Sequence, residues 1–598
     1  MKALKVLLIA VCTVTIAACF SSCLCSRNRV EDRSKKTFFY RNEGKAKTLD
    51  PQKQFDAYSA SAATLIYDSL YMFHYLKRPY EIVPNLAADL PTYSADGRVM
   101  SIKLRDDVSF HDNACFQNGK GRGVDANDVL YTLHRLADSN VNDQGSVTLL
   151  EGLIEGIDDF IKKSKSGSVN YEESKISGLR AVSKYEIEVR LTKPTTVVFN
   201  VLANAITSIV PRECVEFYGL DFGFNPVGSG PFTISYKNRK GDMVLKKNPR
   251  YHLKYPDVGA PGDLELGLLK DAGKPLPMVD EVILPVIEES QPAMLKFLRG
   301  DLDWVRLDAD SFRDMAVKSP EGAFYLKEPY SKKFALFPGV DLAAYWWVFN
   351  MKDELVGKNK KLRLAMAHAI NRQGFVDDIF NGRGVVLDSM IPSTVTGNAK
   401  EVGVSWYPYN PSIARQLLKE AGYPGGKGLP PIKLFYASSP TIQRQYEYIR
   451  RNLDEVGIKL ELETAPYTSY TKKFAEGGFQ FSIGGWGADY LDPENFLMLF
   501  TKDALANELM YGGGWTNPEY EELFKKVRQL QNGPERFALI KQMLEIVKAD
   551  APYIPQFTSN RIGLNAPWIK NWKRNMADDR EAVYIDIDQD LREKGYAP

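Results

Sequence analysis

The sequence predicts a multi-domain protein of the mixed α/β class. Its 598 residues are 44% hydrophobic and 12% aromatic, which is an ordinary globular composition in a chain too long for a single core. Patterns typical of strands and of helices are interspersed along the whole chain. No short-period internal repeat is visible, so solenoids and propellers are not expected.

Two segments show the alternation of apolar and polar residues that is typical of half-buried strands. Residues 99–104 place Ile102 and Leu104 between polar neighbours. In residues 184–191, the apolar positions are Tyr185, Ile187, Val189 and Leu191. Because side chains alternate between the faces of a strand, each pattern puts its apolar side chains on one face. Residues 255–277 and 423–431 are rich in Pro and Gly and predict loops.

Three helices are predicted from their capping residues. The first has Asn410 as N-cap, Pro411 as first helical residue and Gly422 as terminator. Its predicted apolar stripe is Ile413, Ala414, Leu417, Leu418 and Ala421. A second helix starts at Asp125, with Asp128 three residues later and with Val129, Leu133 and Leu136 facing inward. Asn359 caps a third, whose inward side chains are Leu362, Ala365, Ala369 and Ile370.

The N-terminus has the layout of a bacterial lipoprotein signal peptide. Lys2 and Lys5 precede an apolar run over residues 6–18, and small residues stand just before Cys19. The run is shorter than the roughly 20 residues of a spanning helix. We therefore predict cleavage after residues 1–18 and lipidation of Cys19. An uncleaved anchor or ordinary secretory cleavage are the alternatives, and Cys23 is a poorer match for the lipid site.

The segment that follows is polar and charged, without apolar periodicity, and predicts a solvated tether over residues 20–37. Beyond the cysteines of the signal and tether, only Cys115 and Cys214 are present, far apart and without metal-ligand spacing. They form one disulfide in an oxidising compartment or are two buried thiols. The sequence leaves both alternatives open.

Charge and motifs argue against several classes of function. The formal net charge of +2 offers no polybasic field for nucleic acid. The five histidines are scattered and none has the spacing of a zinc helix. The Gly-x-Gly at Gly228–Gly230 is followed by Pro231 and a strand pattern, which argues against a dinucleotide site. No phosphate loop or nucleophile elbow is evident. No metal, cofactor or enzymatic activity is expected.

Motifs in order along nearly the whole chain carry a resemblance to a known family. They include VPNLAADLPTYSADGRVMSIKLRDDVSFHDN at 83–113, GVDANDVLYTLHRL at 123–136, NPVGSGPFTI at 225–234 and APYIPQF at 551–557. The sequence resembles the family 5 extracellular solute-binding proteins, the oligopeptide and dipeptide receptors of ABC importers. In the first motif, Asp96 and Gly97 supply the turn of a hairpin.

The resemblance implies a two-lobed periplasmic-binding-protein clamshell of type II, with an extra inserted domain. Ligand binding would close the lobes about a hinge of two crossover strands. The predicted organisation is a signal peptide (1–19), a tether (20–37), lobe I (38–60, 225–335 and 560–598), an inserted domain II (61–224) and lobe II (336–559).

The segment Gly485–Phe496, GWGADYLDPENF, resembles the ligand-site loop of that family. The resemblance implies that Asp489 pairs with the α-amino group of a bound peptide by a charge-assisted hydrogen bond. Gly485 and Gly487 would permit close backbone approach. Trp486 would wall a side-chain pocket or shield the ion pair, and Tyr490 would lie beside the site or in the core. The alternative for Asp489 is a carboxylate that accepts backbone N–H groups at a turn.

Other positions near this loop receive separate predictions. Asp492, followed by Pro493, is expected to begin a helix. The resemblance places Phe55 and Ala57 on the opposite side of the peptide. Some members carry an arginine six residues before the anchoring Asp, where this chain has Ile483. At least two of the three aromatic residues Tyr345, Trp346 and Trp347 are expected to be buried.

Together these features predict the monomeric, lipid-anchored substrate-binding protein of an ABC importer. It would capture peptides on the periplasmic side of the bacterial envelope and deliver them to a permease, without hydrolysing anything. Two alternatives remain: the same clamshell binds a non-peptide solute such as a sugar, metal chelate or haem-like molecule, or the chain is an exported hydrolase.

Overall fold

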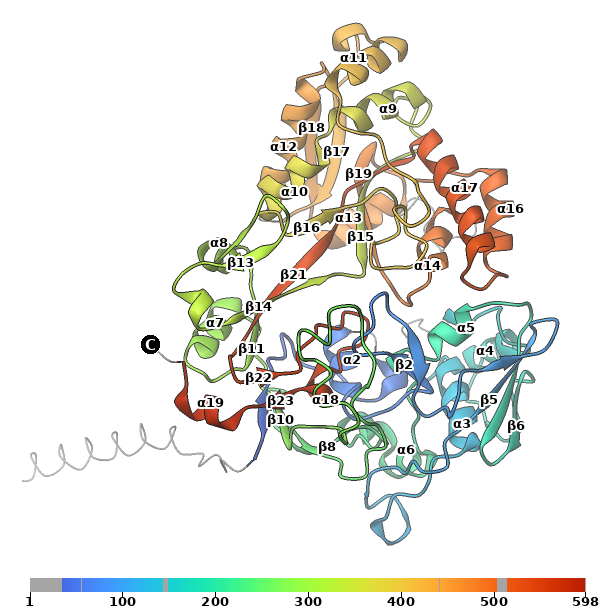
Figure 1. Ribbon diagram of the computed structural model, residues 1–598. Coiled ribbons are helices and arrows are strands. Elements are labelled where there is room, and N and C mark those ends of the chain that lie inside the picture. The colour runs from blue at the N-terminus through green and yellow to red at the C-terminus, as the bar shows by residue number, and fades with distance from the viewer. Residues whose placement is uncertain (1–34, 55, 143–148, 440, 503–512, 597–598) are drawn as a thin grey trace, which may run out of the picture.

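The computed structural model describes residues 35–54, 56–142, 149–439, 441–502 and 513–596 (Figure 1). The predicted signal peptide, Cys19 and Phe55 lie outside these ranges, as does most of the predicted tether. In the part of the chain that is described, no helix is long and apolar enough to cross a membrane.

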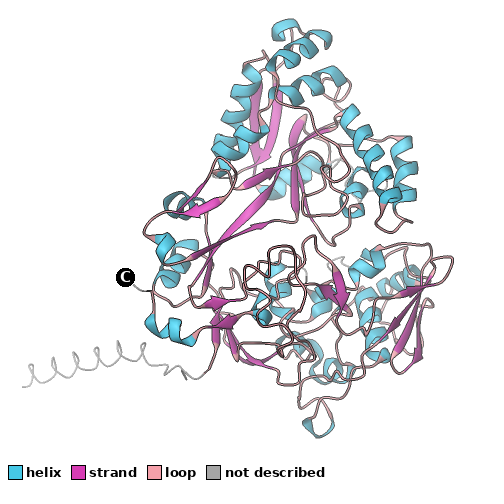
Figure 2. Cartoon of the chain, viewed as in Figure 1, coloured by secondary structure: helices cyan, strands magenta, loops and turns pink. Residues whose placement is uncertain are grey.

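The chain folds into an upper body (residues 343–555) and a lower body (residues 35–334 and 566–596), as Figure 1 shows. The upper body is built on a mixed five-stranded sheet, with helices on both of its sides (Figure 2). In spatial order its strands are β18 (Leu460–Ala465), β17 (Ile432–Ala437), β19 (Phe481–Gly487), β15 (Ala343–Phe349) and β20 (Tyr553–Pro555). Its helices are α9 (Lys360–Ala369), α10 (Arg372–Phe380), α11 (Pro411–Glu420), α12 (Ile442–Asp454), α13 (Tyr467–Ala475), α14 (Glu494–Leu497), α16 (Pro518–Val527) and α17 (Pro534–Asp550).

Both faces of this sheet are buried, because neighbouring residues of β15 enter two different cores. Trp346 packs with the cluster that includes Phe500 and Tyr553, whereas Trp347 packs with the cluster around Phe375. Both tryptophan side chains are fully buried, which confirms the prediction that at least two of the three aromatic residues are buried. A sheet covered on both sides requires apolar residues at successive positions.

The predicted helix caps are confirmed. Asn410 accepts hydrogen bonds from the backbone of Ser412 and Ile413 at the start of α11. Asp125 forms a capping box at the start of α3 (Ala126–Ala137), and Asn359 caps α9. The predicted stripe of α11 is wrong at Ile413, which is 40% exposed. Only the Ala414 and Leu418 side chains of this helix are buried, so the helix contacts the core along a narrower face than its sequence indicates.

The lower body contains two four-stranded sheets. The first has the order β1 (Thr37–Phe39), β10 (Glu281–Leu284), β9 (Met243–Lys247) and β8 (Phe232–Lys237). The second has the order β4 (Thr92–Tyr93), β5 (Val99–Lys103), β7 (Glu186–Arg190) and β6 (Leu179–Ser183). Both predicted strands are therefore present, as β5 and β7, and they pair in antiparallel register. Ile102, Ile187 and Val189 are buried as expected.

The remaining elements of the lower body are short. Its other helices are α2 (Ala57–Ala63), α4 (Ile157–Lys165), α5 (Val197–Val201), α6 (Arg212–Tyr218), α7 (Ser290–Leu298), α8 (Ala309–Met315), α18 (Glu581–Tyr584) and α19 (Gln589–Lys594). Its other strands are β2 (Tyr71–Phe73), β3 (Ile82–Pro84), β11 (Trp304–Arg306), β12 (Ala316–Lys318), β13 (Phe324–Leu326), β22 (Ile569–Lys570) and β23 (Asp586–Ile587). Residues 255–277 form the predicted long loop.

Two antiparallel strands connect the bodies. β14 (Ala335–Val340) pairs along its whole length with β21 (Phe557–Asn565), which also pairs with β11 below and with β16 (Gly384–Val386) above. Figure 1 shows β21 running from one body to the other. This connection has the form expected of a hinge between two lobes. The residue boundaries predicted for the individual domains stay predictions.

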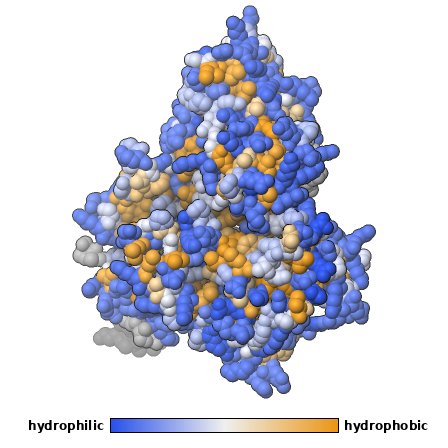
Figure 3. All heavy atoms as spheres, turned by 45° about the vertical axis from the view of Figure 1, so that its right-hand side comes forward, coloured by the Kyte–Doolittle hydropathy of each residue, from blue (hydrophilic) through white to orange (hydrophobic). Residues whose placement is uncertain are grey.

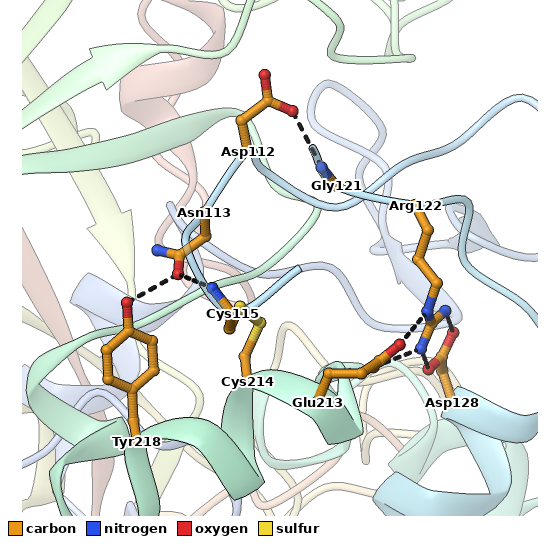
Figure 4. Close-up of a disulfide and its surroundings, with 9 residues drawn as sticks. All are labelled: Asp112, Asn113, Cys115, Gly121, Arg122, Asp128, Glu213, Cys214 and Tyr218. Carbon is orange, nitrogen blue, oxygen red and sulfur yellow. Dashed lines mark hydrogen bonds and ion pairs between the residues drawn. A yellow bond between two sulfur atoms is a disulfide. The ribbon is translucent and has the colours of Figure 1, made fainter. Parts of the chain in front are cut away.

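Cys115 and Cys214 form a disulfide (Figure 4). The bond joins the loop around Asn113 to α6, where the side chain of Asn113 also accepts a hydrogen bond from the Tyr218 hydroxyl at 2.7 Å. Arg122 links α3 and α6 through ion pairs of 2.6 Å with Asp128 and with Glu213. Of the two alternatives that the sequence left open, a disulfide or two buried thiols, the structure therefore shows the disulfide.

Candidate ligand-binding site

The loop that carries Asp489 leaves the upper sheet beside the hinge. Its strand, β19, lies between β17 and β15 and ends at Gly487. The next residue, Ala488, donates its backbone N–H to the carbonyl oxygen of Leu342 at 3.0 Å. Leu342 lies in the short link between β14 and β15. The loop is therefore directed toward the space between the two bodies.

Asn495 holds the two ends of this loop together. Its Oδ1 accepts hydrogen bonds from the indole Nε1 of Trp486 at 3.0 Å and from the backbone N–H of Asp489 at 3.1 Å. Its Nδ2 donates to Oδ2 of Asp489 at 3.1 Å. The side chain of Asp489 thus has a fixed orientation before any ligand arrives.

Asp492 fixes the far end of the loop. Its Oδ1 accepts the backbone N–H of Glu494 at 2.8 Å, as predicted for a residue that begins a helix, although α14 starts one residue later than expected. Both carboxylate oxygens also bind Arg536 of α17, at 2.7 and 2.8 Å. The two side chains are 2% and 0% exposed. Asp492 is therefore a structural residue.

Asp489 lies on the wall of a cavity of about 200 Å³ between the two bodies. The upper body contributes Leu342 and residues 488–491, and the lower body contributes α2, residues around Asn204 and the segment Met576–Arg580. The bodies touch at this point, because Asn204 Nδ2 donates to the backbone carbonyl of Asp489 at 3.0 Å. Figure 3 shows hydrophobic side chains gathered where the bodies meet, on a mainly hydrophilic surface.

The Asp489 carboxylate is desolvated without a cation to balance it. Burial raises the pKa of its carboxyl group above the ordinary value, and the hydrogen bond from Asn495 opposes that rise. Within the described ranges, Asp489 forms no ion pair with a lysine or arginine. A buried carboxylate is ordinarily paired, so the arrangement leaves room for a cation from outside the chain.

The structure brings some of the predicted site residues to this cleft and not others. Asp489 and Tyr490 line the cavity. Tyr490 is only 5% exposed, donates its hydroxyl to Glu494, and packs with the core of the lower body. The sequence left open whether Tyr490 lies beside the site or in the core. It lines the cavity and also packs into the core.

The lining of the two cavities described for this cleft does not include Gly485, Trp486 or Gly487. A Cβ atom at Gly485 would lie 2.8 Å from the ring of Tyr345 on β15, so the close approach there is made by a neighbouring strand. Gly487 has open space around it. Trp486 packs against an upper core and reaches Asn495. Any contact of these residues with a ligand stays a prediction.

A second cavity, of about 110 Å³, adjoins the first along α2. Ser61 and Asp579 line both cavities, and Ala57 lines the second. Guanidinium groups gather in the second cavity: its lining includes Arg41, Arg306, Arg561 and Arg574. Arg306 binds Glu43 at 2.7 Å, and Arg41 reaches the same carboxylate only at 3.9 Å. One carboxylate therefore serves two guanidinium groups.

Sequence reasoning missed three polar residues of the cleft. Asn204 and Asn495 hold the Asp489 loop, and Asp578 of the lower body lines the same cavity as Asp489. Asn495 has a weak local signal, because it is a short polar residue six positions after Asp489. Asn204 and Asp578 are 285 and 89 positions away from Asp489 in sequence, so no local pattern relates them to it.

Comparison with known proteins identifies the family. The sequence matches the family model described as "Bacterial extracellular solute-binding proteins, family 5 Middle" over residues 81–508. That stretch covers more than half of the chain. The chain belongs to the family 5 extracellular solute-binding proteins.

Individual family 5 relatives cover almost the whole chain at low identity. Heme-binding protein A of Haemophilus influenzae is 24% identical over 96% of this chain and 97% of its own length. The Dipeptide-binding protein of Escherichia coli is 24% identical over 86% of this chain and 88% of its own. The names of these two relatives thus refer to different solutes.

Solved structures of similar proteins show the same fold. The periplasmic binding protein DppA of Helicobacter pylori, in complex with peptide STSA, matches with a TM-score of 0.66 and 23% identity over 93% of this chain and 99% of its own. HbpA2 of Haemophilus parasuis matches with a TM-score of 0.71 and 21% identity over 92% and 100%. The two-lobed type II fold predicted from the sequence is confirmed.

Proposed function

We propose that this family 5 protein is the substrate-binding component of an ABC importer and that it captures peptides in the cleft between its two bodies. In this proposal Asp489 binds the α-ammonium group of the peptide. The observation that carries the proposal is the Asp489 carboxylate itself, which is oriented by Asn495, desolvated, and unpaired on a cavity wall. A peptide ammonium group supplies the missing charge and up to three hydrogen-bond donors.

The second cavity suits the other end of a short peptide. Arg41 and Arg306 share the single carboxylate of Glu43, which leaves one positive charge in surplus. Ser61 lines both cavities, and Ala57 lines the second one. These two residues of α2 are four positions apart, which is about 6 Å along the helix axis. An extended peptide covers about 3.3 Å per residue. The distance along α2 corresponds to about two residues of an extended peptide, so short peptides match the cleft. In this proposal the arginines take the place of the arginine absent at Ile483.

The N-terminal sequence supports a membrane-tethered receptor on the periplasmic side of the envelope. In this proposal Cys19 carries the lipid, residues 20–37 form the tether, and the body acts as a monomer that docks on a permease without a cofactor. Mass spectrometry of the N-terminal tryptic peptide tests the lipid directly. Detection of an unmodified N-terminus elsewhere than at Cys19 would overturn that part.

A haem-like solute is the alternative suggested by the name of one relative. Haem carries two propionate groups, and these would meet Asp489, Asp578 and Asp579 on the walls of the main cavity. Like charges in a desolvated site repel one another. The charge of this cavity therefore favours a cationic group over an anionic one.

Native purification followed by mass spectrometry of the released solute tests the proposal. The protein is purified gently from its source, denatured, and the small molecules are separated and identified. Short peptides are expected. If a sugar, metal chelate or porphyrin is released and no peptide is found, the peptide assignment is wrong.

A further inference from the structure

The lower body contributes a second carboxylate to the lining of the cavity that Asp489 lines. Asp578 lies in the segment Met576–Arg580 that lines the cavity. Its side chain is 10% exposed, and its nearest cationic atom is Nε of Arg580, at 3.4 Å. No described residue donates a hydrogen bond to this carboxylate. The Asp578 side chain is therefore nine-tenths buried, and Arg580 is its one ion-pair partner among the described residues.

The arginine that serves Asp578 is already committed to another acid. Nη1 of Arg580 lies 2.9 Å from Oδ1 of Asp68, and both of these side chains are buried, at 4% and 0% exposure. His252 faces Asp68 as well, but burial lowers the pKa of this histidine, so it is neutral at neutral pH. One positive charge therefore serves two carboxylates.

A neighbouring arginine, Arg574, is likewise shared by two carboxylates. Arg574 binds Glu581 at 2.5 Å and Asp579 at 3.3 Å, and Asp579 lines both cavities. The lining of the main cavity itself holds three carboxyl groups, Asp489, Asp578 and Asp579, and one guanidinium group, Arg580. The lining therefore has two more acids than bases.

The raised pKa values of nearby carboxyl groups and the apolar lining agree with this excess of acids. Burial raises the pKa of Asp578 to about 6 and that of Glu581 to about 7, because the arginines lower these values only in part. The cavity also has apolar wall atoms from Phe73, Leu342 and Met576. An aliphatic stem that ends in a positive charge is the side chain that packs on such walls and reaches such acids.

We propose that the main cavity binds a doubly charged cationic group: the α-ammonium of a peptide at Asp489 and the basic side chain of its first residue at Asp578. This inference rests on the proposed function and specifies its substrate class as peptides that begin with lysine or arginine. A single α-ammonium group balances only one of the two acids in excess. A second positive charge from the same residue balances the acid on the opposite wall.

Calorimetry with three matched tripeptides tests this inference. The peptides are Lys-Ala-Ala, norleucine-Ala-Ala and Ala-Ala-Ala, so that the first two share an aliphatic stem and differ in charge. The protein as purified is expected to bind the lysine peptide at least about tenfold more tightly than the norleucine peptide. Equal affinity for these two peptides overturns the inference without the use of any variant.

Substitutions at one position then assign the preference to Asp578. Asp578→Asn is expected to reduce the ratio between the lysine and norleucine peptides to about one, and to weaken the binding of Ala-Ala-Ala less than that of Lys-Ala-Ala. Asp578→Glu, which keeps the charge, is expected to retain the preference. The matched control is Asp314→Asn, on the exposed surface of α8, which is expected to change neither quantity.

The outcomes separate this inference from the proposed function. If none of the three tripeptides binds, the peptide function itself fails. If all three bind but the lysine preference persists in Asp578→Asn, peptide capture stands and the role of Asp578 is wrong.

Discussion

Asp489 combines three properties that rarely occur together in a residue with a purely structural role. It is held by a hydrogen bond from Asn495, it is desolvated enough to raise its pKa, and it lies on a cavity wall without a cationic partner. A raised pKa in the folded protein means that ionisation of this group opposes folding. The stability it contributes in its protonated form is lost as the pH rises through the folded pKa. At neutral pH the ionised carboxylate of Asp489 therefore destabilises the ligand-free protein.

Replacement of Asp489 by asparagine should separate binding from stability. Asparagine keeps an oxygen that accepts the Asn495 hydrogen bond but removes the charge, so the thermal midpoint of unfolding should be unchanged or higher. The affinity for a peptide should fall on the order of 10²-fold, because the bound ammonium loses its counter-charge in a desolvated site. Calorimetry and thermal denaturation measure the two quantities, with Asp314→Asn as control. Unchanged peptide affinity would contradict the anchor role.

At the level of elements, local signals were predictable and long-range ones were not. The caps at Asn410, Asp125 and Asn359 depend on residues within three positions, so the sequence alone reveals them. Arg536, the partner of Asp492, comes from a helix 44 residues away. The tertiary fold brings these two residues together, and no spacing in the sequence predicts their contact. The resemblance located the loop, whereas the contacts that orient Asp489 required the structure.

The pair between Asp492 and Arg536 should be a large local contribution to the stability of the upper body. Asp492→Ala leaves the fully buried Arg536 without its counter-charge. The expected loss is about 3–5 kcal/mol of unfolding free energy, measured by urea denaturation. The double variant Asp492→Ala with Arg536→Leu should recover part of that loss, since no charge then remains unpaired. A loss no larger than that of Asp314→Ala would show that water reaches the pair.

Across the lower body, the Cys115–Cys214 disulfide closes a long loop of the chain. The two cysteines are 99 positions apart, and Cys214 is fully buried. A crosslink over a loop of that length restricts the unfolded chain strongly, by about 4.7 kcal/mol for 100 residues in the chain-entropy account. The stabilisation is expected wherever the protein resides in an oxidising compartment.

Replacement of both cysteines by serine should lower the stability of the lower body while the folded site remains intact. The expected loss is about 2–5 kcal/mol, visible as a lower urea midpoint for the first unfolding transition. Peptide affinity under native conditions should be unchanged, because neither cysteine lines the cleft. The matched comparison is the original protein with and without reductant. An unchanged midpoint in both experiments would contradict a stabilising role.

For the whole molecule, closure about β14 and β21 brings the cleft residues of the two bodies together. Side chains of the two bodies already meet near the cleft. Asn204 donates to the Asp489 carbonyl, Thr196 Oγ1 donates to Asp492 Oδ2 at 3.2 Å, and Tyr490 packs into the lower core. The hydrogen bond from Asn204 exists only when the bodies are close. It therefore stabilises the closed form relative to the open one, and the affinity for a ligand that binds the closed form depends on that balance.

Asn204→Ala should shift this balance toward the open form. Loss of one hydrogen bond of about 0.5–1.5 kcal/mol predicts a decrease in peptide affinity of roughly 2- to 12-fold, together with a larger radius of gyration without ligand by small-angle X-ray scattering. Asn127→Ala, on the exposed side of α3, is the control. At saturating peptide both proteins should reach the same compact state, because binding energy replaces the missing contact. If affinity falls while the ligand-free dimensions stay the same, Asn204 contacts the peptide itself and does not act through closure.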